Sequence, residues 1–176
     1  ELASVLEGKD NLFVIACNKC FKEFETVDEP DCDEFLKFAA EQGKNVTGSA
    51  KLDFLCNKMH TENKLQDLIP EGTENVVVIS CGLGIQTVAD LAGKPVIAAS
   101  NTLNYRGHHG MALTKKSCDA CAQCYLNITG GVCPIVDCSK SLVNGQCGGA
   151  KNGKCEVDPN KDCAWEKIYQ RLAKQG

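Results

Sequence analysis

Thirteen cysteines in 176 residues constrain this chain more than any other feature of its sequence. Cysteines at this density serve either as disulfide partners or as metal ligands. A secreted disulfide-rich domain normally carries an even number of cysteines in a short chain with little regular secondary structure. Here the number is odd, and the N-terminal half has the pattern of an ordinary α/β protein. Disulfides are therefore the less favoured alternative, and we expect a reduced, metal-binding protein of the cytoplasm.

Composition narrows the classes of function. Hydrophobic residues make up 43% of the chain and charged residues 24%, which is typical of a globular protein and excludes a disordered one. The net charge of −4 argues against a nucleic-acid partner, because phosphate contacts need an excess of Lys and Arg. No apolar run approaches the roughly 18–20 residues that cross a bilayer, so we expect no membrane span.

The composition changes near residue 112. Residues 1–112 hold five cysteines and a charge of −7, whereas residues 113–176 hold eight cysteines and a charge of +3. We predict an α/β domain over 1–112, followed over 113–176 by a loop-rich, cysteine-rich domain that binds iron–sulfur clusters or zinc and ends in a helix.

The first part alternates two kinds of hydrophobic pattern. Apolar runs predict strands and helical periodicity predicts helices. The strands are expected at 12–16, 51–55, 76–80 and 95–99, and the helices at 33–42 and 86–91. Strands that alternate with helices form a parallel sheet. The fold class is therefore α/β, a small Rossmann-like unit.

Cysteines follow three of the predicted strands. Cys17 and Cys20 follow the first, Cys56 follows the second and Cys81 follows the third; we call these four the strand-end group. In open parallel sheets ligands bind outside the carboxyl ends of the strands, so three strand ends would deliver four sulfurs to one edge. A lone cysteine is usually a small buried hydrophobe, but four together predict one metal centre. Cys32, just before a predicted helix, has no place in this pattern.

A glycine-rich turn surrounds Cys81. The segment 80–86, Ser-Cys-Gly-Leu-Gly-Ile-Gln, joins a strand to a helix but has Thr87 in place of the third glycine of a dinucleotide-binding fingerprint. Nucleotide binding is therefore the weaker hypothesis, and a tight turn into the helix is the simpler one. The start of a helix also stabilises a thiolate, which suits Cys81 as a ligand.

Three cysteines of the second part have the spacing Cys-x-x-Cys-x-x-Cys: Cys118, Cys121 and Cys124. This cysteine run is typical of cubane iron–sulfur proteins, which add a distant Cys-Pro. Here Cys133-Pro134 follows after an eight-residue spacer, and Cys133 could complete this cluster or belong to another. The alternative is structural zinc, which prefers paired Cys-x-x-Cys knuckles.

Four further cysteines follow at nearly even intervals, with spacers of 8, 7 and 7 residues. We call them the C-terminal group: Cys138, Cys147, Cys155 and Cys163. Glycine-rich turns separate them, and such a segment cannot fold on hydrophobic burial alone. We therefore expect a bound metal to stabilise it. The spacing leaves both zinc and an iron–sulfur cluster open.

The remaining residues give no catalytic site. One face of a terminal helix is apolar and is expected to pack on the rest of the protein: Trp165, Ile168, Tyr169 and Leu172. His60 is four residues after Cys56 and is expected to pack or face solvent rather than bind zinc, and His108 and His109 are expected in an exposed loop. No Ser–His–Asp, Cys–His or paired-carboxylate arrangement is evident, so we expect no enzyme activity of the chain on its own.

Several strings of residues resemble a known family. The segments 133–149, 153–157 and 162–172, together with Ala-Cys-Asn-Lys-Cys at 16–20 and the turn at 80–86, are similar to the methylenetetrahydrofolate reductase C-terminal family. Free-standing members of that family are the MetV-type small subunits of acetogenic bacteria. The resemblance covers nearly the whole chain.

The resemblance implies a partner and a role. The partner would be a MetF-type catalytic subunit, a flavin-bearing TIM barrel that reduces methylenetetrahydrofolate. This chain would then be an iron–sulfur subunit with two or more 4Fe-4S clusters, and zinc possible at one four-cysteine site. It would pass electrons from a donor protein to that flavin in the Wood–Ljungdahl pathway. The alternative is a zinc-stabilised scaffold that only docks the catalytic subunit.

Overall fold

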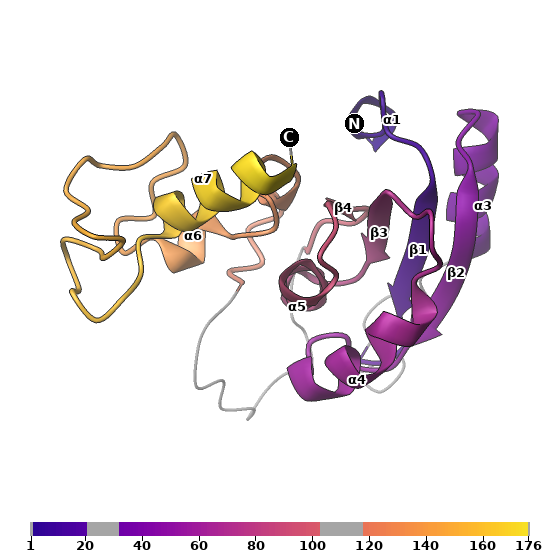
Figure 1. Ribbon diagram of the computed structural model, residues 1–176, viewed down its shortest axis with the longest axis horizontal. Coiled ribbons are helices and arrows are strands. Elements are labelled where there is room, and N and C mark those ends of the chain that lie inside the picture. Colours follow the sequence, from indigo (N-terminus) through magenta and orange to yellow (C-terminus); the bar gives the residue numbers. More distant parts are fainter. Residues whose placement is uncertain (1, 21–31, 103–117, 176) are drawn as a thin grey trace.

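The chain builds a four-stranded parallel sheet with the strand order β2-β1-β3-β4 (Figure 1). The computed structural model describes residues 2–20, 32–102 and 118–175. The strands are β1 Leu12–Cys17, β2 Val46–Leu52, β3 Asn75–Ile79 and β4 Val96–Ala98. The helices are α1 Leu2–Val5, α3 Cys32–Glu41, α4 Lys58–Leu68, α5 Gly82–Leu91, the 3-10 turn η1 Leu126–Ile128, α6 Pro134–Asp137 and α7 Ala164–Gln175.

Side chains of the central strand β1 alternate between the two faces of the sheet. Phe13 and Ile15 pack in one buried cluster with residues of α4 and α5. Leu12 and Val14 pack in a second cluster with residues of α1 and α3. Both faces are therefore covered, as is usual for parallel sheets, and the unit has three layers.

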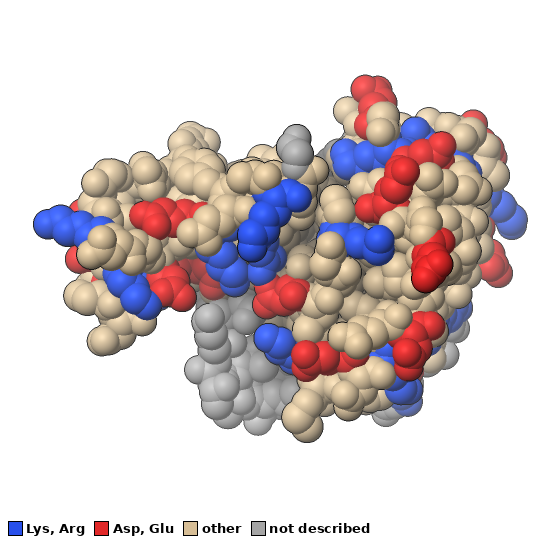
Figure 2. Space-filling view, viewed as in Figure 1, with Lys and Arg blue, Asp and Glu red and all other residues tan. Residues whose placement is uncertain are grey.

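The C-terminal part lies beside α5, on the side away from β2 (Figure 1). Most of it is loop, and its own buried cluster consists of Val132, Trp165 and Ile168, with Cys138 and Cys163 packed against it. Positive and negative side chains meet where α7 adjoins the sheet part (Figure 2).

One ion pair at this junction joins Arg171 of α7 to Asp90 of α5. The guanidinium of Arg171 also donates to the carbonyls of Gly130 and Gly131, at 3.1 and 3.4 Å. The terminal helix is thus tied both to the sheet part and to the loop before α6.

The predicted α/β fold with a parallel sheet is confirmed, and β1, β3 and β4 lie where their apolar runs predict them. The strand expected at 51–55 is wrong in its position, since β2 ends at Leu52 and a turn occupies 53–56. β2 is an edge strand of small and polar residues and lacks the apolar run of a buried strand. Helix α5 begins at Gly82, earlier than expected. The boundary expected at 112/113 lies outside the described residues.

Two further observations concern the whole fold. Helix α4 has only two buried residues, Thr61 and Leu65, so its apolar periodicity is too weak to predict a helix.

In the part of the chain that the structure describes, no helix is both long and apolar enough to cross a membrane.

Candidate metal centres

The strand-end group occupies the carboxyl edge of the sheet. Cys17 is the last residue of β1, Cys56 lies in the turn after β2, and Cys81 lies between β3 and α5. Their thiols are close enough to affect one another. Desolvation by the surrounding protein raises the pKa of the Cys56 thiol, and negative charge on Cys81 and Cys17 raises it further. The structure therefore gathers these three thiols at one edge, with Cys20 three residues beyond Cys17.

Backbone geometry sets the positions of two members of this group. Cys20 has a left-handed backbone, with φ of 64°. Phe54, two residues before Cys56, is also left-handed with φ of 51°, and its carbonyl accepts a hydrogen bond from the Asn57 N–H at 2.8 Å. A bulky residue in this conformation is strained. The turn that carries Cys56 is therefore held by the fold and is not a relaxed loop.

The start of α5 faces the thiol of Cys81, the residue that caps this helix. Burial raises the pKa of the Cys81 thiol, and the backbone N–H groups of Gly84 and Leu83 lower it. A Cβ on Gly84 would lie 2.2 Å from Oγ of Ser80. Gly84 is thus needed for close packing of the helix on the strand, which explains the glycine-rich turn without a nucleotide.

The cysteine run lies against the same end of α5. A Cβ built on Gly82 would be 2.8 Å from Sγ of Cys118. Ala120 donates its backbone N–H to that sulfur at 3.4 Å, and both Ala120 and Ala122 are left-handed, with φ of 49° and 59°. Successive N–H groups in such turns form concave surfaces that bind anions. This backbone suits thiolates and anionic clusters.

Cys133 lies with the cysteine run. Burial raises the pKa of the Cys133 thiol, the N–H groups of Val136 and Ile135 lower it, and negative charge on Cys118 raises it. Cys124 and Cys133 also pack against the apolar cluster between the sheet and α5. Of the two open possibilities for Cys133, the geometry favours the one in which it serves the same centre as the run.

One side chain docks this segment on the edge of the sheet. Asn127 of η1 accepts a hydrogen bond from the N–H of Ala98 at 2.6 Å and donates one to its carbonyl at 3.1 Å. Ala98 is the last residue of the edge strand β4. The amide of Asn127 therefore continues the hydrogen bonding of the sheet as a further strand would.

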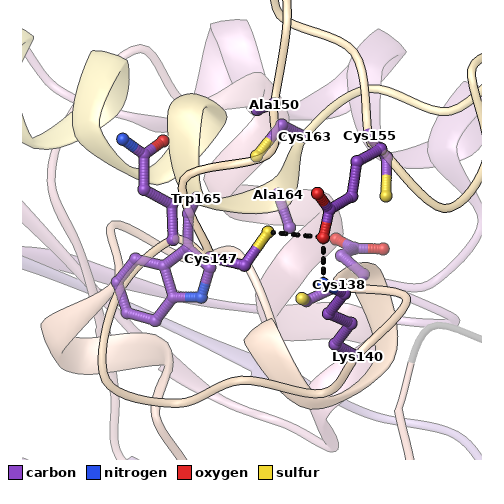
Figure 3. Close-up of a pocket in the computed structure, with 11 residues that line it drawn as sticks. Cys138, Lys140, Cys147, Ala150, Cys155, Cys163, Ala164 and Trp165 are labelled. Carbon is purple, nitrogen blue, oxygen red and sulfur yellow. Dashed lines mark hydrogen bonds and ion pairs between the residues drawn. The ribbon is translucent and has the colours of Figure 1, made fainter.

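The C-terminal group surrounds one pocket (Figure 3). Its wall is formed by four stretches of the chain: the end of α6 with the residues after it, two loops, and the start of α7 with the residue before it. The lining includes all four cysteines of the group, Cys138, Cys147, Cys155 and Cys163, together with Lys140, Glu156 and Trp165. The indole N–H of Trp165 donates to the Leu142 carbonyl at 2.8 Å, which fixes the loop beside it.

Polar groups contact the sulfurs of this pocket. The thiol of Cys147 donates to the carboxylate of Glu156 at 3.4 Å, and the same carboxylate pairs with Lys140, as the dashed lines of Figure 3 mark. Ser139 Oγ lies 3.5 Å from the Cys155 sulfur. This hydroxyl and the N–H groups of residues 158 and 157 lower the pKa of the Cys155 thiol.

One local pattern recurs in all three places. For Cys81, Cys133 and Cys155 alike, the backbone N–H groups two and three residues further along the chain lower the pKa of the thiol. Such donors stabilise the charged form of a thiol, which is the form that binds metal. The chemistry of these donor sets therefore fits thiolate-ligated metal.

In none of these places do the cysteine side chains converge on a single metal position. Over residues 2–20, 32–102 and 118–175, no three His, Cys, Asp or Glu side chains stand close enough as placed to hold a metal ion. No disulfide joins any of the thirteen cysteines, all of which are described. The assignment of the twelve cysteines as ligands stays a prediction.

The C-terminal part matches a known family. Residues 97–176 match the sequence model of the family described as methylene-tetrahydrofolate reductase C terminal. The match covers 80 of the 176 residues. The family segment contains η1, α6, α7 and eight of the thirteen cysteines. A search of curated proteins and a search of solved structures find no match.

Other predicted residues take less central places. Cys32 is buried as the first residue of α3, on the face of the sheet away from α5. His60 lies in α4, and its buried Nε2 has no hydrogen-bond partner among the residues that the structure describes. His108 and His109 lie outside the described residues. On the terminal helix, Trp165 and Ile168 are buried as predicted, but Tyr169 and Leu172, which were expected on the same packed face, are exposed.

Sequence reasoning missed several residues around the family's cysteines. Glu156 and Lys140 face the C-terminal group, and Gly82 adjoins the cysteine run. Glu156 could have been proposed from the sequence, because this charged residue directly follows Cys155 in the predicted loop region. Nothing in the sequence could have paired Gly82 with Cys118, because 36 positions separate them.

Proposed function

We propose that this chain is the iron–sulfur electron-transfer subunit of a methylenetetrahydrofolate reductase complex, of the MetV type. It would pass electrons to the flavin of a MetF-type catalytic subunit in the Wood–Ljungdahl pathway. The observation that carries the proposal is the gathering of cysteines at three places in a chain whose C-terminal part matches the reductase family. We place the chain in the cytoplasm, where thiols stay reduced and can bind metal.

The residues of each site would have distinct tasks. The strand-end group would hold one centre, the cysteine run with Cys133 a second, and the C-terminal group a third. When bound, a cluster supplies reversible one-electron chemistry. The chain itself contributes thiolates, and the N–H groups that face Cys81, Cys133 and Cys155 stabilise their negative charge.

Around the C-terminal group, the ion pair of Lys140 and Glu156 carries no net charge beside the Cys147 sulfur. The positive charge of a bound metal would therefore offset the negative charge of four thiolates there. No acid–base constellation accompanies these cysteines among the described residues, so the proposal gives the chain electron transfer and leaves substrate chemistry to its partner.

A zinc-stabilised scaffold is the second candidate. One observation favours it: the C-terminal group lies in loops whose only buried cluster has three members, Val132, Trp165 and Ile168. A structural metal with four cysteines stabilises such a segment without any redox role.

Metal analysis of the full chain separates the two candidates. Protein purified without oxygen should contain iron and acid-labile sulfide and show broad visible absorption that dithionite bleaches. The variant Cys121→Ser should lose the iron of one centre, whereas Cys32→Ser should keep all of it because Cys32 lies under the other face of the sheet. A colourless protein that carries only zinc would refute the electron-transfer function and favour the scaffold.

A further inference from the structure

Gly82 lies between two of the cysteine groups. It directly follows Cys81 of the strand-end group, and the sulfur of Cys118 in the cysteine run lies over it. A Cβ at this position would be 2.8 Å from that sulfur and 3.4 Å from Cβ of Cys118. Non-bonded carbon atoms pack at about 3.5–4.0 Å, so a side chain here would push the run away. The absent side chain brings the two groups within one residue of each other.

Thr102 ties the same two groups together. Its hydroxyl oxygen accepts a hydrogen bond from the N–H of Gly82 at 2.7 Å. Its carbonyl accepts one from the N–H of Ala122, inside the cysteine run, at 3.3 Å. Thr102 therefore binds both the first residue of α5 and the middle of the cysteine run.

The strand-end group and the cysteine run also pack against the same apolar cluster. Cys17 of the strand-end group packs against the apolar cluster between the sheet and α5, and so do Cys124 and Cys133. Buried side chains of this cluster are closely packed and resist displacement. The folded core thus sets the spacing of the two groups.

We propose that Gly82 and Thr102 hold the strand-end group and the cysteine run as two adjoining centres that interact directly and form an electron relay inside this chain. The inference rests on the proposed iron–sulfur function. In the relay one electron leaves the reduced centre and enters the oxidised one, and no bond is made or broken. A low-potential one-electron donor supplies the electron, and dithionite does so in the test.

The test is a double-variant cycle read by electron paramagnetic resonance. The full chain, Cys56→Ser, Cys121→Ser and the double variant are loaded with iron and sulfide and fully reduced with dithionite. The C-terminal group is unchanged in all four proteins and cancels from the cycle. Two interacting reduced centres should give a broadened or split signal in the unsubstituted protein that is lost in each single variant, which should also lose the iron of one centre.

Thr102→Val removes the acceptor of the Gly82 N–H with little change in volume, and Thr87→Val is its matched control. Thr87 lies in the same helix as Gly82, and its hydroxyl donates a hydrogen bond within that helix, to the carbonyl of Leu83 at 2.9 Å. We expect Thr102→Val to weaken the interaction signal or to lose the iron of the run, and Thr87→Val to do neither. An unchanged Thr102→Val protein would overturn the positioning role.

Three results of the cycle have separate meanings. If the spectral changes of the two single variants sum to the change in the double variant, the two centres do not interact. That result would refute the relay while leaving the iron–sulfur function intact. Loss of iron from both places in either single variant would also refute it, because one shared centre would replace two. An unsubstituted protein without iron would refute the proposed function itself, together with the relay that rests on it.

Discussion

Asn127 offers a direct test of how the cysteine run is docked on the sheet. Its side chain makes two hydrogen bonds to the backbone of Ala98, at 2.6 and 3.1 Å. Ala98 is only 7% exposed, so its N–H and carbonyl have limited access to water once Asn127 is cut back. We therefore predict that Asn127→Ala destabilises the protein.

The size of the effect follows from these two bonds. A hydrogen bond contributes about 0.5–1.5 kcal/mol net, so the loss of both lowers the free energy of unfolding by about 1–3 kcal/mol. For a chain of this length about 1.5 kcal/mol corresponds to a decrease in Tm of about 3–6 °C. The measurement is thermal and denaturant unfolding of proteins shown to have equal metal content, because bound metal also stabilises the fold.

The neighbouring residue provides the control. Ile128 is 69% exposed, so Ile128→Ala should change the free energy of unfolding by less than about 0.5 kcal/mol. A loss below about 0.5 kcal/mol for Asn127→Ala itself would show that this amide does not hold the segment on β4.

Three further predictions concern other contacts. Arg171→Ala should cost about 1–2 kcal/mol of stability, because it removes the ion pair with Asp90 and two hydrogen bonds to carbonyls, and a double-variant cycle with Asp90→Ala should be non-additive. Backbone N–H groups, that of Asn45 first, hold the pKa of the Asp10 carboxyl below its ordinary value. Its stabilisation is therefore present above the ordinary pKa and lost as pH falls through the lowered one, so Asp10→Asn and the unsubstituted chain should converge in strong acid. Removal of metal by a chelator should speed hydrogen exchange across 138–163 while the strands stay protected, since that segment has little buried cluster of its own; equal protection with and without metal would contradict this.

The strands that are buried on both faces could be predicted, because burial requires a run of apolar residues. The runs at β1 and β3 are apolar because both faces of these strands are covered, and the cysteine after each strand end then falls at the carboxyl edge. The edge strand β2 has no such apolar run, because its residues are mostly half-exposed. The position of Cys56 relative to its strand was for this reason misjudged.

The candidate site was predictable as three groups of cysteines, two from their spacing and one from the strand ends, but not as an assembly. Spacing along the chain relates Cys118 to Cys121, yet the contact of Cys118 with Gly82 depends on tertiary packing. The same holds for Cys133 beside the run and for Glu156 beside Cys147. Distances of this kind follow from how the loops fold over α5, which no local pattern encodes.

Stopped-flow reduction of the partner's flavin tests the central proposal most directly. The complex of this chain with its flavin-bearing catalytic subunit is mixed, without oxygen, with a low-potential one-electron donor, and the same is done with the catalytic subunit alone. We predict that the flavin is reduced rapidly only when this chain is present, and that Cys121→Ser in the complex slows the reduction. Equally fast reduction of the flavin without this chain would contradict the electron-transfer role.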